Sequence, residues 1–310
     1  MSRCAQFLGA VDAVLPLTAR DVPRAEILFA SLRRRFDGLG TVFVVVPRAQ
    51  LDEIGRAFRP RSDGVGLGLE ILPEDEVVPE FALFPRMHGW YKQQLIKLAI
   101  AERVSSAFYL TLDADVVLTR DVSPERLCPN GKASCFIIEE DLHPRWYART
   151  ARLIDRPLRQ KGIVHNVTPA VLAKDGVRLL TEHFEARWQQ RRWARGARAW
   201  RQRWVRLRLG RRRTDLAGWR LFLAAGMRWT EYALYYSFLE AYDLFDRFHE
   251  RVTTCVYDID RSVWKAGAQA FDNWSPKALF EGEGPPYFVV LQSNTQLPPP
   301  VIWEKLDGYL

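Results

Sequence analysis

Apolar segments that favour β-strands alternate with helical segments through the N-terminal part of this chain, over 1–140. Strands are expected at residues 12–18, 41–47, 69–72, 108–119 and 134–138, and helices at 22–36, 49–58 and 90–104. The expected strands are apolar along most of their length, which is typical of parallel strands buried on both faces. Their alternation with helices predicts an α/β fold with a mostly parallel sheet. Ligands of such sheets bind at the carboxyl ends of the strands.

Two aspartates, Asp113 and Asp115, interrupt the apolar run of residues 108–119. In an extended chain, side chains two residues apart point to the same face. Buried carboxylates are costly unless they are paired or bind a metal, so we expect this pair at a strand end that faces a cleft. Two such oxygen ligands suit Mg²⁺ or Mn²⁺, which also bind substrate phosphates. An Asp-x-Asp pair also occurs in ordinary turns, but the apolar residues on both sides favour the metal.

The segment that precedes the aspartates by one helix carries side chains suited to a nucleotide. Trp90 can stack on a base, and phosphates or base edges can be contacted by Lys92, Gln93 and Lys97. An amphipathic helix with its lysines and glutamines in water explains the same pattern, and from these residues alone it is the favoured interpretation.

Three positions in the second half of the chain are further candidates. His165 and Asn166 lie in a short strand-like run, residues 162–169, where a single histidine is more typical of a core than of a ligand set. Glu231 follows Thr230 at the start of a helix expected at 229–240, where it acts either as a capping carboxylate or as a base or clamp for an acceptor hydroxyl. Gln292, near the end of a late strand at 286–294, either reaches a phosphate or the metal or simply begins a polar loop.

Three blocks of this sequence, in order, resemble the GT-A class of nucleotide-sugar glycosyltransferases, and more narrowly a group of bacterial relatives of glycosyltransferase family 8. They are GWYKQQLIKL at 89–98, LDADVVL at 112–118 and WTEYALY at 229–235. The resemblance covers most of the chain except an arginine- and tryptophan-rich segment at 181–215. It implies one GT-A-like, Rossmann-like domain over 1–310, with a nucleotide-binding half at 1–140 and an acceptor half at 141–310.

The resemblance also implies roles for individual residues. Asp113 and Asp115 would hold Mn²⁺ or Mg²⁺ on the diphosphate of a nucleotide sugar, with a UDP-sugar as the expected donor. Nucleotide contacts are implied for Thr18, Asp21, Lys92 and Gln93, a place near the donor sugar and the acceptor for His165 and Asn166, and a place near the reacting carbon for Glu231. Family 8 members usually supply a late histidine as a third metal ligand, whereas residues 290–294 of this chain contain none.

Basic charge is concentrated in one segment of the chain. Twelve arginines and no acidic residue or lysine lie between Arg187 and Arg213, so the net charge of +8 becomes −4 over the remaining residues. If residues 181–213 form one helix, or two helices separated near Gly196, then Trp193, Trp200 and Trp204 lie along one face of it, and most arginines lie on other faces. This pattern suits an anionic membrane surface, or equally a solvated helix packed through its tryptophans. Nucleic-acid binding is disfavoured, because it more often spreads basic residues over a whole domain.

Composition sets limits on the compartment. The chain contains no apolar stretch long enough to span a bilayer, and its N-terminus is a poor signal peptide. Its four cysteines lack metal-site spacing and are expected to be reduced thiols. We therefore expect a cytoplasmic protein that can lie at the inner face of the membrane.

The function expected from these features is transfer of a sugar from a nucleotide sugar to a saccharide or lipid-linked acceptor, in surface polysaccharide synthesis. Two alternatives remain open at this point. The pattern Asp113-x-Asp115-x-Val117 also fits haloacid-dehalogenase-like phosphatases, although their motif usually ends the first strand of the domain. A basic adaptor that binds membrane or RNA through residues 187–213 is the non-catalytic alternative.

Overall fold

The computed structural model describes residues 9–58, 67–138, 144–158, 164–165, 168–190, 218–226, 228–264, 271 and 273–310, with only the backbone at 164–165. Most of the segment rich in arginine and tryptophan, residues 191–217, therefore lies outside the described residues, as does Asn166. In the described part of the chain, no helix is both long and apolar enough to cross a membrane.

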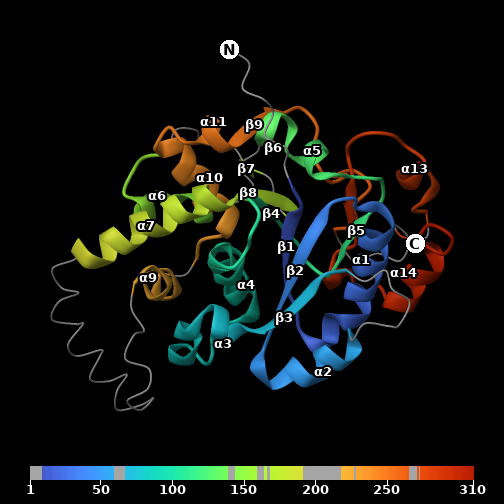
Figure 1. Ribbon diagram of the computed structural model, residues 1–310, viewed down its shortest axis with the longest axis horizontal. Coiled ribbons are helices and arrows are strands. Elements are labelled where there is room, and N and C mark those ends of the chain that lie inside the picture. Colours follow the sequence, from blue (N-terminus) through green and yellow to red (C-terminus); the bar gives the residue numbers. More distant parts are fainter. Residues whose placement is uncertain are drawn as a thin grey trace.

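A five-stranded sheet forms the centre of the molecule (Figure 1). Its strands lie in the order β3 (Leu69–Pro73), β2 (Leu39–Val46), β1 (Val11–Pro16), β4 (Phe108–Thr111) and β8 (Ala170–Ala173). The first four run parallel, and β8 pairs antiparallel with β4. β1 and β4 are buried along their whole length, as their continuous apolar sequences predict. The expected α/β fold with a mostly parallel sheet is confirmed.

The order of the strands reverses between β1 and β4. From β1 the chain passes through α1 (Val22–Arg35) to β2 and through α2 (Leu51–Ala57) to β3. It then returns past β1 through α3 (Glu74–Val77) and α4 (Gly89–Ala99) to reach β4. Figure 1 shows α1 and α2 on one side of the sheet, and α3 and α4 on the other. A reversal of this kind opens a crevice at the carboxyl ends of the two strands, where α/β proteins bind ligands.

The run 108–119 is not one strand, which corrects the sequence expectation. β4 ends at Thr111, the backbone turns, and β5 (Val116–Leu118) pairs antiparallel with β10 (Phe288–Val290) in a separate two-stranded sheet. The amide of Leu112 still bonds the carbonyl of Val14, and the amide of Val116 then bonds back to the carbonyl of Asp113. The two aspartates therefore lie in the turn between the strands, directly after the carboxyl end of β4.

Helices and a small sheet make up the second half of the chain. The sheet consists of β7 (Val164–His165), β6 (Ala133–Ile138) and β9 (His249–Val252). The larger helices are α6 (Pro144–Ile154), α7 (Lys174–Gln190), α9 (Trp219–Ala225) and α10 (Glu231–Ala241). Every residue of α10 is buried, so this helix is the core of the half. Its start is as expected, because the Thr230 hydroxyl accepts a hydrogen bond from the Ala233 amide, 3.2 Å away. Pro169 directly precedes β8.

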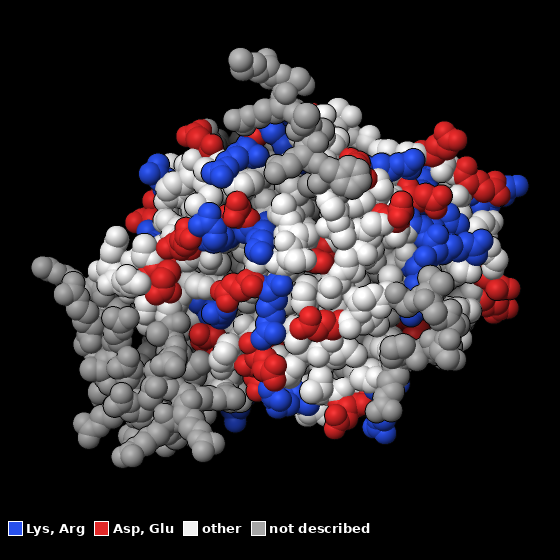
Figure 2. Space-filling view, viewed as in Figure 1, with Lys and Arg blue, Asp and Glu red and all other residues white. Residues whose placement is uncertain are grey.

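Short elements connect these layers. Among the described residues, the remaining helices are α5 (Pro124–Leu127), α11 (Phe245–Phe248), α13 (Lys277–Phe280) and α14 (Pro299–Lys305). The 3-10 turns there are η1 (Ala19–Asp21), η2 (Arg48–Gln50), η3 (Pro79–Leu83), η4 (Ile100–Glu102), η5 (Pro129–Gly131) and η6 (Ser293–Thr295). Figure 2 shows acidic and basic side chains interspersed on the face that it presents.

Candidate functional site

A pocket of about 820 Å³ opens at the point where the strand order reverses. The end of β1 and the turn after β4 supply one part of its wall, through Pro16, Arg20, Asp21, Asp113, Ala114 and Asp115. The rest comes from α4, the first turns of α6 and α10, residues around 257–264 and 290–294, and two single residues, Ile138 and Thr168. The pocket thus joins both halves of the chain.

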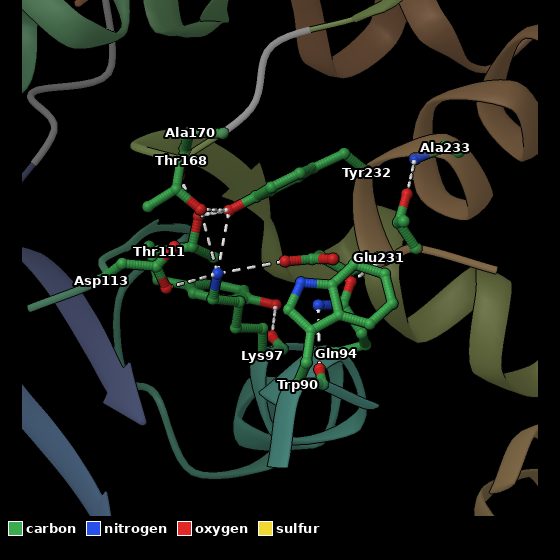
Figure 3. A network of polar contacts seen from close by, with 12 residues as sticks. Trp90, Gln94, Lys97, Thr111, Asp113, Thr168, Ala170, Glu231, Tyr232 and Ala233 are labelled. Atoms are coloured by element: carbon green, nitrogen blue, oxygen red, sulfur yellow. Dashed lines mark hydrogen bonds and ion pairs between the residues drawn. The ribbon is translucent and has the colours of Figure 1, made fainter. Parts of the chain in front are cut away.

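A buried lysine lies at the centre of the polar network (Figure 3). The side chain of Lys97, on α4, is 2% exposed, yet its ammonium group lies 3.0 Å from Asp113 Oδ1 and 3.1 Å from Glu231 Oε1. It also donates to the hydroxyl of Thr168, 3.0 Å away. Burial alone disfavours the ammonium form, but the two carboxylates outweigh burial and hold the pKa of Lys97 well above its ordinary value. Lys97 is therefore a fixed positive charge.

Hydroxyl groups complete the shell around Lys97. The phenol oxygen of Tyr232 lies 2.8 Å from the Thr111 hydroxyl and 2.7 Å from the Thr168 hydroxyl. The Thr111 hydroxyl donates in turn to the carbonyl of Ala170, 3.0 Å away, in the neighbouring strand β8. These bonds tie the end of β4, the start of β8 and the first turn of α10 together around a single cation. A network that links so many elements holds its members in a fixed arrangement.

Glu231 is held in place through its backbone as well as its side chain. Its amide donates to Gln94 Oε1, 3.1 Å away, and Gln94 Nε2 donates to the carbonyl of Trp90, also 3.1 Å away. The Glu231 side chain is 2% exposed. Burial raises the pKa of Glu231 above its ordinary value, Lys97 opposes this shift, and Asp113 adds to it. A carboxyl group with a raised pKa at the edge of a pocket is suited to proton exchange with a bound hydroxyl.

Asp115 is fixed by the loop that follows β10. Its Oδ2 accepts a hydrogen bond of 2.8 Å from the amide of Ser293, and its carbonyl accepts one of 2.8 Å from Leu291. Arg24, buried on α1, holds the same loop by donating to the carbonyls of Leu291 and Leu297. Burial, and then the charge of Asp113, raise the pKa of Asp115 to about 6, while Ser293 and Arg24 oppose the rise. The two aspartates are thus close enough to repel one another.

The structure brings most of the predicted site residues together. Pocket-lining residues among them are Asp21, Trp90, Gln93, Lys97, Asp113, Asp115, Glu231 and Gln292. Thr18 is not a lining residue, but its hydroxyl donates to Asp21 Oδ2 at 2.5 Å and so positions that carboxylate. His165 belongs to β7 through its backbone, and its side chain, like Asn166, lies outside the described residues.

Lys92 and Lys97 differ from the sequence expectation. Lys92 lies outside the pocket walls formed by the described residues, because it pairs with Glu74 at 2.5 Å beside the ring of Phe81. The interpretation of α4 as a helix with its lysines in water is wrong for Lys97, which the two carboxylates hold inside the protein. Helical spacing distinguishes the two positions, because residues five apart lie on different faces of a helix.

Several residues of the site were missed by sequence reasoning. They include Gln94, Thr111, Thr168, Tyr232 and Trp146. Gln94 and Tyr232 each adjoin a candidate that was identified, and this adjacency is the one signal that marks them. Trp146 carries no such signal, since its partner Trp90 belongs to a distant part of the sequence.

Comparisons with known proteins place the chain in a family. A family model described as a family of unknown function (DUF6492) matches residues 9–310. The chain belongs to this family. A search of curated proteins found no match. Among solved structures, the crystal structure of mouse xyloside xylosyltransferase 1 in its apo form is similar at a TM-score of 0.46 and 14% sequence identity, covering 93% of this chain and 100% of that one. The relation to glycosyltransferase family 8 stays a prediction.

In this member of the family, the pocket contains a buried, fixed cation and several carboxyl groups, and aromatic and aliphatic side chains also line it. Within the described residues, no group of three histidine, cysteine, aspartate or glutamate side chains is arranged to hold a metal ion. Any divalent cation held by the aspartate pair would therefore need further oxygen ligands from a substrate, from water or from a neighbouring amide.

Proposed function

We propose that this protein is a glycosyltransferase that moves a sugar from a nucleotide sugar to a hydroxyl group of a saccharide or lipid-linked acceptor. In the overall reaction, the bond between the sugar C1 and the diphosphate oxygen breaks, and its electron pair leaves with the nucleoside diphosphate. A new bond forms between C1 and the acceptor oxygen. The acceptor hydroxyl releases its proton, so a nucleoside diphosphate, a glycoside and one proton are the products.

The observation that carries this proposal is the position of Asp113 and Asp115. They follow the carboxyl end of β4 at the reversal of strand order, and they line the same pocket as the residues that follow β1. This is the crevice in which open α/β sheets bind nucleotides. A volume of about 820 Å³ is in the range of pockets that enclose a small organic ligand. We therefore place the nucleotide beside Asp21 and the diphosphate beside the two aspartates.

The aspartate pair fits a divalent cation bound together with the substrate. Burial and mutual repulsion already raise the pKa of Asp115 to about 6, so a positive charge between the two carboxylates relieves an existing repulsion. Mg²⁺ is typically held by one or two carboxylates plus substrate phosphates and water. The amide oxygen of Gln292, on the same wall, is a further oxygen ligand of the right kind. When bound, the cation neutralises the diphosphate and so makes it a better leaving group.

In this proposal Lys97 and Glu231 have different tasks beside the reacting bond. Lys97 keeps Asp113 and Glu231 at a fixed separation and adds a permanent positive charge to the pocket floor. Glu231 lies where an acceptor hydroxyl can reach it, and its raised pKa suits it to hold or take the proton of that hydroxyl. The proposed setting is the cytoplasmic face of a membrane, reached through residues 187–213, in the synthesis of a surface polysaccharide.

A screen for release of nucleoside diphosphate tests the proposed function. Wild-type protein is incubated with UDP-, GDP-, ADP- and dTDP-sugars, with and without Mn²⁺, and the nucleoside diphosphate is quantified. Slow hydrolysis of one donor is expected, since water can replace a missing acceptor. Asp113→Asn should abolish this release, whereas Lys92→Ala should leave it unchanged because Lys92 lies outside the pocket walls.

The same samples test the phosphatase alternative. Release of inorganic phosphate from p-nitrophenyl phosphate, with no release of nucleoside diphosphate from any sugar donor, would overturn the glycosyltransferase proposal. Neither activity, together with no shift in melting temperature on addition of any donor, would do so as well.

A further inference from the structure

We infer that Trp90 and Trp146 form a platform on which a pyranose ring of the acceptor stacks, so that the acceptor is a saccharide at the point where it meets the enzyme. This inference rests on the proposed function and goes beyond it by naming the group that the acceptor side of the pocket recognises. It also assigns Trp90 to the acceptor, although the sequence alone suggested a nucleobase.

The two tryptophans form one aromatic wall of the pocket. Both line it, and both are partly exposed. Their ring centroids are 5.5 Å apart and their planes are inclined by 31°. Trp90 lies in the first turn of α4 and Trp146 in the first turn of α6, so the wall is made by two helices from different halves of the chain. Partly exposed tryptophans placed together inside a pocket are available to a ligand.

This wall is attached to Glu231. The carboxamide of Gln94 bridges the Trp90 carbonyl and the Glu231 amide through bonds of 3.1 Å on each side. On the other helix, α6 packs against α10, whose first residue is Glu231. Tyr147, next to Trp146, packs against Ala233 in a small apolar cluster. Both tryptophans therefore keep a fixed relation to the carboxyl group that is proposed to meet the acceptor hydroxyl.

The nucleotide side of the pocket is built from different elements. Asp21 follows β1, and Asp115 is fixed by Ser293 from the loop after β10. Lys97 stands between the two sides, because it contacts both Asp113 and Glu231. Figure 3 shows Asp113 and Glu231 on opposite sides of the Lys97 ammonium group. Lys97 thus separates Asp113 from Glu231, the residue to which Trp90 is tied through Gln94.

The chemistry of the wall favours a sugar ring. The face of an indole is electron-rich and attracts the weakly positive C–H groups on the flat face of a pyranose. Gln93 lies one helical turn after Trp90 and lines the same pocket, so an amide group is available beside the aromatic surface for sugar hydroxyls. A hydrocarbon chain on the same surface would leave such a polar group without a partner.

Binding to a glycan array, with UDP and Mn²⁺ present to fill the donor side, tests this inference. Wild-type protein is expected to bind at least one group of pyranose-terminated glycans. Trp146→Ala and Trp90→Ala should each weaken this binding at least about tenfold, which equals about 1.4 kcal/mol. Trp146→Phe should retain most of it, because an aromatic face remains. Trp303→Ala is the matched control, since Trp303 is 43% exposed on α14 and is not part of the pocket wall.

Titration of UDP into each variant separates the possible outcomes. The platform predicts that UDP affinity stays within about twofold of wild type in all tryptophan variants. Loss of UDP affinity in Trp90→Ala with unchanged glycan binding would assign Trp90 to the base and overturn the inference. Binding of UDP by wild type without binding of any glycan, or with glycan binding that Trp146→Ala does not change, would also overturn it. Failure of the proposed function is distinct, because wild type would then bind none of UDP, GDP, ADP and dTDP in the same titration. Melting curves identify any variant that fails to fold. If Trp146→Ala fails, Trp146→Leu replaces it, since leucine keeps an apolar side chain without an aromatic face and should weaken glycan binding relative to Trp146→Phe.

Discussion

Replacing Lys97 with methionine removes the cation at the centre of the network while keeping a side chain of similar length. Asp113 and Glu231 then lose the ammonium group that lies 3.0 and 3.1 Å from them, and Glu231 is buried. Breaking a buried ion pair by removing one partner typically costs about 3–5 kcal/mol. An unfolding entropy of about 2.1 cal/mol/K per residue over the 310 residues gives about 0.65 kcal/mol/K. The melting temperature of Lys97→Met should therefore fall by about 5–8 °C.

A second substitution identifies the cause of this loss. If the cost comes from the uncompensated charge of Glu231, then Lys97→Met combined with Glu231→Gln should melt at a higher temperature than Lys97→Met alone. Lys277→Met serves as control, because Lys277 is 73% exposed and its ion pair with Glu281 is long, at 4.0 Å. Differential scanning calorimetry measures all four proteins. A Lys97→Met protein that melts within about 1 °C of wild type, or a double variant less stable than the single one, would refute the reasoning.

Three further substitutions have defined outcomes. Asp12→Asn should cost about 3 kcal/mol, because the buried Asp12 carboxylate accepts hydrogen bonds from the amides of Ser106, Thr41 and Ser105. Burial raises the pKa of Asp12, but these bonds together lower it below its ordinary value of 3.8. The difference in melting temperature from wild type should therefore be constant above about pH 5 and shrink as the pH falls below about 4. Arg24→Met should weaken UDP binding in a titration, because Arg24 holds the loop that fixes Asp115, whereas Lys92→Ala should not. An unchanged UDP affinity in Arg24→Met would show that this loop does not shape the donor side. Glu231→Gln should lower the rate of sugar transfer with little change in donor affinity, and weaker donor binding at an unchanged rate would contradict the role proposed for it.

The parallel sheet and the position of the aspartates were predictable because they depend on local signals. Continuous apolar runs such as 41–46 specify buried parallel strands, and Asp113 stands at the end of one of them. The break between β4 and β5 was not predictable, since residues on both sides of the aspartates are equally apolar. Only the pairing of Val116–Leu118 with β10, which comes near the other end of the chain, separates the two strands.

Burial of charge was the main feature that the sequence did not reveal. Lys92 and Lys97 have the same chemistry and lie on one helix, yet one pairs near the surface with Glu74 and the other lies in the core. The difference arises from Glu231, which is distant from Lys97 in the sequence and lies beside it only after α10 has packed against α4. The pairing of Trp90 with Trp146 depends on long-range packing in the same way.

The most direct test of the central claim is a calorimetric titration of UDP into the protein with Mn²⁺ present or removed by chelation. Wild-type protein is expected to bind UDP more tightly with Mn²⁺ than without it. Asp113→Asn and Asp115→Asn, both folded at the temperature of the titration, are expected to lose this dependence on Mn²⁺. The contrary result is a variant that binds UDP with the same affinity and the same Mn²⁺ dependence as wild type, which would show that the aspartates between β4 and β5 are not the donor site.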